Sequence, residues 1–155
     1  MARWDVESFL DELKTYLQAN LNTKIAAINT EKGDSLLSTL ANDAYLIQDL
    51  ESKTMTYDPF VIMGVVDVET IPTGPLTAKI YTIDVIMILQ QQNNSDNYKR
   101  LFRYQRALED VFDAGWNSIN HRVKIELESL VPGFALVSVP QQHRAIGMGL
   151  RVTIT

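Results

Sequence analysis

Hydrophobic residues recur with a helical period in two stretches of the chain, one near the N-terminus and one in its second half. The first stretch predicts a helix over residues 5–21, which Asp5 caps and residues 22–23 (Asn-Thr) end. Its apolar positions are Val6, Phe9, Leu10, Leu13, Tyr16, Leu17 and Leu21. Residues 24–30 fit either a second short helix or a loop, which Gly33 follows.

The second stretch, residues 96–116, predicts a long helix lying on a sheet. Ser95 is the expected N-cap, and Gly115 is the expected stop because glycine accepts a positive φ at low cost. The side chains expected to form the buried stripe are Tyr98, Leu101, Phe102, Leu108, Val111 and Phe112, with Gln105 as one polar gap.

Three cations share one face of this predicted helix. Lys99, Arg103 and Arg106 follow one another at i, i+4 and i+7. One interpretation is a solvated polar face. The other is a basic stripe that meets an acidic surface on another chain, so the three residues are candidate interface residues.

Residues 35–90 carry the first strands. Leu36, Leu37 and Leu40 fit a helical turn and Tyr45, Leu46 and Ile47 fit a short strand. Residues 60–68 and 77–90 are rich in β-formers, and together they predict a long antiparallel hairpin with a candidate bulge at Gly64. The second of these strands is apolar on both faces, which is typical of a central strand. The prolines and glycine of residues 71–76 predict a loop that projects from the body, with Ile71, Thr73 and Leu76 as candidate contact residues.

After the long helix, the hydrophobic period returns to two. Residues 123–127, 134–139 and 148–154 are the expected strands. The predicted fold is therefore α+β: a mostly antiparallel sheet with a long β-hairpin, packed against an N-terminal helix and a long central helix. The length of 155 residues predicts one domain.

Charge is unevenly distributed along the chain. Residues 1–95 hold six Lys and Arg against 13 Asp and Glu, a net charge of −7, whereas residues 96–155 carry +2. Opposite charges of this kind suit head-to-tail contacts between copies. The total of −5 argues against nucleic-acid binding as the main function. There is no cysteine, no signal-peptide pattern and no apolar run of about 20 residues, so we expect a soluble protein without a disulfide framework.

Catalytic and metal-binding motifs are absent from the sequence. His121 and His143 lack partners at metal-ligand spacing, and no phosphate-binding loop or nucleophile elbow occurs. Asp84, inside the apolar strand, is the most interesting carboxylate, and we interpret it as lying on the less covered face. Asp67 and Glu69 are interpreted as a solvated acidic rim. Aromatic residues near the basic helix raise the option of single-strand binding; they are Phe102, Tyr104 and Trp116.

The order of four segments along the chain resembles that of a known class of proteins. After the N-terminal helix come INTEKGDSLL (Ile28–Leu37), YDPFVIMGVVDVET (Tyr57–Thr70), RLFRYQRALEDVF (Arg100–Phe112) and the closing GMGLRVTIT. This order resembles the tail-terminator and neck proteins of long-tailed bacteriophages of the siphophage type. The most specific parts are INTEKGD, residues 28–34, and RYQRALEDVF, residues 103–112.

The resemblance implies a virion structural protein and not an enzyme. A small α+β subunit would close into a hexameric ring, cap the head-proximal end of the tail tube and offer a docking face to the head connector or head-closure protein. Genomic DNA would pass through the lumen without sequence-specific binding. No catalytic residue, cofactor or membrane is implied, and the location would be the virion tail or neck after assembly in the host cytoplasm.

Three other functions remain open at this point. Another neck ring, such as a head-closure or adaptor protein, is the nearest alternative. A nucleic-acid-binding module would use the basic stripe. A small enzyme would have to use Asp84, His121 or His143.

Overall fold

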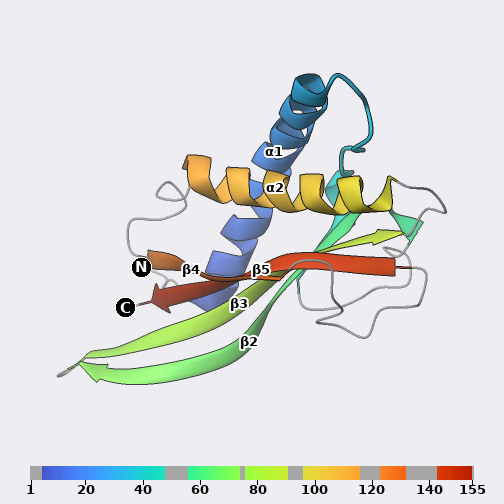
Figure 1. Ribbon diagram of the computed structural model, residues 1–155. Coiled ribbons are helices and arrows are strands. Elements are labelled where there is room, and N and C mark those ends of the chain that lie inside the picture. Colours follow the sequence, from blue (N-terminus) through green and yellow to red (C-terminus); the bar gives the residue numbers. More distant parts are fainter. Residues whose placement is uncertain are drawn as a thin grey trace.

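Helices and strands combine in the α+β fold that the sequence predicts (Figure 1). The computed structural model describes residues 5–47, 56–73, 76–90, 96–115, 123–131 and 143–154. Its elements are α1 (Val6–Lys32), the short 3-10 helix η1 (Asn42–Ala44), β1 (Tyr45–Ile47), β2 (Phe60–Thr73), β3 (Leu76–Gln90), α2 (Asn97–Gly115), β4 (Val123–Val131) and β5 (His143–Ile154). The strands form a sheet in the order β1-β2-β3-β5-β4.

Helix α1 is longer than predicted, because it continues through Asn22 to Lys32. Asp5 caps its start as expected, accepting the Ser8 N–H at 3.0 Å. Its buried side chains are Phe9, Leu10, Leu13, Leu17, Leu21, Ile25 and Ile28, so the stripe keeps its helical spacing beyond Asn22. The helix ends at Gly33, whose φ of 70° is the left-handed conformation that closes a helix.

The segment after α1 is irregular, so the helical turn predicted for Leu36, Leu37 and Leu40 is wrong. Several of its backbone groups bond to side chains of α1 and α2. The Asn22 amide donates to the Leu40 carbonyl at 2.9 Å and accepts the Leu40 N–H at 2.7 Å. Asn29 holds the Leu37 backbone in the same way, at 2.8 and 3.1 Å. Asn22 therefore fastens the returning chain to α1 and does not end the helix.

Strand β3 is central, as predicted. It pairs antiparallel with β2 and β5, β4 pairs antiparallel with β5, and the short β1 lies parallel to β2. One face of β3 is buried at Ile83, Val85, Met87 and Leu89. On its other face Ile86 and Ile88 are buried, whereas Thr82 and Asp84 are half-buried. This is the pattern expected of a strand covered fully on one side and partly on the other.

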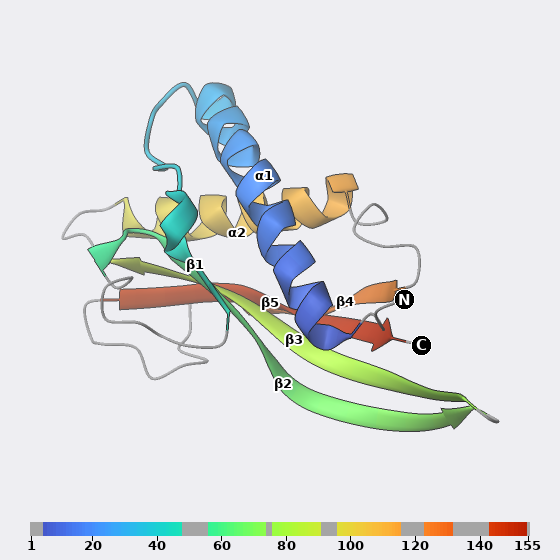
Figure 2. The ribbon, with the colours of Figure 1, turned by 180° about the vertical axis from the view of Figure 1, so that it is seen from behind.

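The β2–β3 hairpin is longer than predicted. Residues 71–76 were expected to form a loop, but β2 runs to Thr73 and β3 begins at Leu76, where these two residues pair. The register shifts between Val65 and Asp67, so the irregularity is not at Gly64 as predicted. Figures 1 and 2 show the far end of this hairpin extending beyond both helices, which cross each other over the opposite part of the molecule. We call residues 66–73 and 76–82 the hairpin arm.

Some predictions fall on parts of the chain outside the described residues. They are the strand at 134–139, the N-cap at Ser95, and the positions of Trp116 and His121. His143 is the first residue of β5.

Candidate functional site

The first half of helix α2 buries a different face from the one that the sequence predicted. Its buried side chains are Arg100, Tyr104, Gln105, Ala107, Leu108, Val111 and Phe112. Tyr98 and Phe102 were expected in the buried stripe, but they are 73% and 63% exposed. In the C-terminal half, Leu108, Val111 and Phe112 are buried as predicted. In the N-terminal half, Leu101 is partly buried against the core, but Arg100 and Tyr104 take the buried places that were expected for Tyr98 and Phe102.

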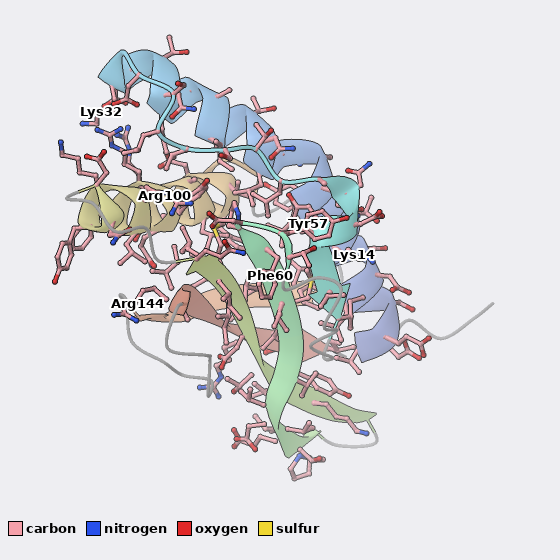
Figure 3. The ribbon with its side chains drawn as sticks, turned by 90° about the vertical axis from the view of Figure 1, so that its right-hand side faces the viewer. Lys14, Lys32, Tyr57, Phe60, Arg100 and Arg144 are labelled. Atoms are coloured by element: carbon pink, nitrogen blue, oxygen red, sulfur yellow. The ribbon has the colours of Figure 1, made fainter. Side chains whose placement is uncertain are left out.

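Arg100 occupies this buried face because an acidic partner lies opposite it. Its guanidinium donates to both Asp58 carboxylate oxygens at 3.0 Å and to the Gln90 carbonyl at 3.1 Å. Asp58 also accepts the Gln90 N–H at 3.0 Å. Figure 3 shows Arg100 on the side of α2 that faces the start of β2, near Phe60. A charge this deeply buried needs a paired, hydrogen-bonded partner, so the cluster fixes α2 on the sheet.

The hydroxyl of Tyr104 joins α2 to the segment that follows α1. It accepts the Ser38 N–H at 2.8 Å and donates to the Ser38 carbonyl at 2.9 Å. Burial raises the pKa of Tyr104, because the phenolate would lose its water. The Arg100 guanidinium lies 5.9 Å from the Tyr104 ring centroid. A stacking platform for nucleic-acid bases needs an exposed ring, so Tyr104 does not supply one.

The basic stripe of α2 pairs with acidic residues at the end of α1. Arg103 binds the Asp34 carboxylate at 2.9 and 3.0 Å. Arg106 binds Glu31 through two bonds of 2.7 and 3.0 Å. Lys99 is 64% exposed and lies 3.9 Å from the Asp96 carboxylate, one turn away. Of the three stripe residues, the two arginines are therefore engaged within the chain.

These pairs perturb the titration of both carboxyl groups. Hydrogen bonds from Arg103 lower the pKa of Asp34, and hydrogen bonds from Arg106 lower the pKa of Glu31. Both carboxylates are exposed to solvent, so each pair contributes little to stability individually. Together they set the position of the end of α1 on the first half of α2.

The predicted contact residues of the hairpin lie at the far end of the arm. Ile71 is half-buried and pairs with Ala78, and Thr73 and Leu76 form the last pair before the tip. β1 accompanies β2 only as far as Met63. Beyond that point no strand among the described residues covers the outer edge of β2, and such an edge offers unpaired backbone groups to another chain.

Asp84 lies in the middle of β3, between two glycines. Its cross-strand neighbours are Gly64 on β2 and Gly149 on β5. Asp84 is half-buried on the less covered face of the strand, as predicted. Asp67 and Glu69 are exposed on the arm, and Glu69 lies 3.8 Å from Arg151.

Neither a metal-binding cluster nor a membrane span is found in the described parts of the chain. No group of three or more His, Cys, Asp or Glu side chains gathers there in an arrangement that holds a metal ion. No described helix is long and apolar enough to cross a lipid bilayer. Comparison with protein-family models and with curated protein sequences gives no match.

Proposed function

We propose that this protein is a bacteriophage tail terminator, a ring-forming subunit that caps the head-proximal end of the tail tube and joins it to the head connector. The proposal takes its function from the resemblance of the segment order to this class of proteins. The observation that carries it structurally is the hairpin arm, which extends beyond the helices of its own chain (Figure 1). An element of this kind is suited to contacts with a neighbouring subunit or with the tube.

The two segments most specific to the resemblance lie against each other in the fold. Residues 28–34 cover the end of α1 and the two residues after it, and residues 103–112 form the middle of α2. The Asp34–Arg103 and Glu31–Arg106 pairs join them. These two segments therefore meet at one junction between helices, where their charges are matched. This contact supports the proposal that the chain has the subunit fold of the tail-terminator class.

The same ion pairs weigh against a nucleic-acid-binding module. Binding to a phosphate backbone requires cations that are free to replace counterions. Arg103 and Arg106 already have carboxylate partners, and the chain carries −5 overall. An acidic ring would repel DNA phosphates and let the genome slide through its lumen.

The test is tail-tube growth in the presence of the purified protein. Tubes of the tail-tube protein from the same phage are polymerised in vitro, and their lengths are measured by negative-stain electron microscopy. We expect one end to carry a ring and elongation to stop at substoichiometric protein. Tubes of unchanged length with no ring at either end would refute the proposal. Binding to purified head connectors without binding to tubes would assign the protein to another ring of the neck.

A further inference from the structure

Strand β2 forms the outer edge of the hairpin arm. β3 pairs with its inner side, and Figures 1 and 2 show β2 as the outermost ribbon of the arm. In the described part of the chain, β1 is the one strand that pairs with the outer side of β2, and it ends opposite Met63. An uncovered strand edge is a template on which another chain can add a strand, so native proteins block such edges.

Three residues of the arm direct their backbone groups to this outer edge. In an antiparallel pair, alternate residues of an edge strand point their N–H and C=O groups away from the neighbouring strand. Pro72 pairs with β3 but has no N–H to give to the ladder, so it belongs to the outward set. The register is regular from residue 67 to residue 73, so Val68 and Thr70 point outward together with Pro72.

Two of these three outward positions have no free N–H for another strand. The Asp67 carboxylate accepts the N–H of Val68 at 2.9 Å, which also agrees with the outward direction of that group. Pro72 lacks an N–H altogether. Thr70 carries the one outward donor that remains among the three. The outward carbonyl groups can still accept hydrogen bonds, but an antiparallel pair needs a donor and an acceptor at each such residue.

The charge of Asp67 acts in the same direction as the loss of donors. The carboxylate lies at the outer edge, because it is bound to an outward N–H group. Its negative charge therefore occupies the place where a carbonyl oxygen of an added strand would accept that N–H. Negative charge beside a carbonyl oxygen is repulsive, and charged side chains on an edge strand are a common means of preventing strand addition.

We infer that Asp67, together with Pro72, closes the outer edge of the arm to strand addition, so that copies of the chain do not join edge to edge through β2. A second copy is the partner excluded, because two identical edges related by a two-fold axis lie antiparallel and lack the same donors. The inference goes beyond the proposed function and does not depend on it. Contacts that the arm makes in a ring would use its side chains and not a sheet continued through β2.

Restoring the missing donors tests the inference. Asp67→Ala frees the Val68 N–H, and Pro72→Thr supplies an N–H without adding a large apolar side chain. The matched control is Glu69→Ala with Pro72→Thr, which removes the same charge from the arm and leaves the bond between Asp67 and Val68 in place. Analytical ultracentrifugation over a range of concentrations measures association, and far-UV circular dichroism confirms that each variant is folded.

The Asp67→Ala/Pro72→Thr variant should associate beyond the mass of the wild type, about tenfold more strongly than the control. The factor follows because two more N–H groups, one from each arm, form bonds that each strengthen pairing by roughly two- to tenfold. Adding Thr70→Pro should weaken this association again, since it removes the remaining outward donor. A variant that keeps the wild-type mass, or a control that associates as strongly, would overturn the inference.

A stability measurement tests the direction of the edge groups independently of any association. Thr70→Pro removes an outward N–H, whereas Glu69→Pro removes an N–H that belongs to the ladder with β3. The urea midpoint should therefore fall far more for Glu69→Pro than for Thr70→Pro, both measured at low protein concentration. Equal losses would show that the outward set is not the one assigned to the arm, and the inference would fail.

Discussion

The buried ion pair between Arg100 and Asp58 gives the sharpest test of what holds α2 in place. Asp58→Asn keeps an oxygen that accepts the Gln90 N–H but removes the negative charge facing Arg100. Breaking a buried pair by removing one charge costs about 3–5 kcal/mol. The Asp58 side chain is 23% exposed, so water relieves part of this cost and we expect a loss of about 3 kcal/mol.

A double-mutant cycle isolates the interaction itself. Arg100→Met removes the buried cation and leaves a carboxylate that water can reach, so its expected loss is smaller, about 2 kcal/mol. The double variant leaves no uncompensated buried charge. It should lose about 3 kcal/mol instead of the sum, which gives a coupling energy of about 2 kcal/mol.

Equilibrium urea unfolding, followed by far-UV circular dichroism at one fixed protein concentration, measures these changes. For an m value of about 2 kcal/mol/M, the Asp58→Asn midpoint should fall by roughly 1.5 M. Arg106→Met is the control, because it removes an exposed arginine from the same helix and should shift the midpoint far less. Additive losses within about 0.5 kcal/mol would show that the pair does not anchor the helix.

Three further predictions concern the segment that follows α1, the glycine at position 147, and the loss of stability at acid pH. Asn22→Ala should cost about 1–2 kcal/mol in urea unfolding, because two backbone groups of the following segment lose their partner while alanine favours the helix. Gly147→Ala should cost more than about 2 kcal/mol, since a Cβ there would lie 2.7 Å from a β3 carbonyl oxygen. Gly33→Ala meets only the strain of its positive φ and should cost about 1 kcal/mol, so a larger loss at Gly33 than at Gly147 would contradict this prediction. The pKa values of Glu31 and Asp34 are lowered from 4.5 and 3.8, so their contribution is present above about pH 4.5 and lost as pH falls through the lowered values. Replacing Arg103 and Arg106 with methionine should make the urea midpoint depend less steeply on pH below about pH 4.5 than it does in the wild type. A pH dependence as steep as that of the wild type would refute the linkage.

Much of the fold follows from short-range pattern. The period of two in residues 77–90 predicted the central strand, and the adjacent run beginning at Phe60 predicted its hairpin partner. The N-cap at Asp5 could also be predicted, because a cap depends only on the next three residues. The sequence also held the signal for the extension of α1, since Ile25 and Ile28 keep the spacing of the stripe. The prediction missed it because Asn22 was interpreted as ending the helix.

The ion-pair partners of the candidate site residues could not be predicted from the sequence. Lys99, Arg103 and Arg106 were placed correctly on one face of a helix, because that face follows from spacing alone. The acidic partners of Arg103 and Arg106 lie about 70 positions away, at the end of α1 and just after it, and only the crossing of the two helices brings Asp34 and Glu31 to them. The hairpin arm was predicted to project, but its strands continue through residues that a proline and glycine pattern assigned to a loop.

The sequence by itself determined the order and type of the two helices α1 and α2 and of the strands β1 to β5, because hydrophobic periodicity and capping act within a few residues. The tertiary structure alone decided which face of α2 is buried. Hydrophobicity favours Tyr98 and Phe102 inside and Arg100 outside, and the opposite arrangement is observed. It is stable because Asp58, 42 residues from Arg100, meets the buried guanidinium and satisfies its charge, and no local pattern records a partner at that distance.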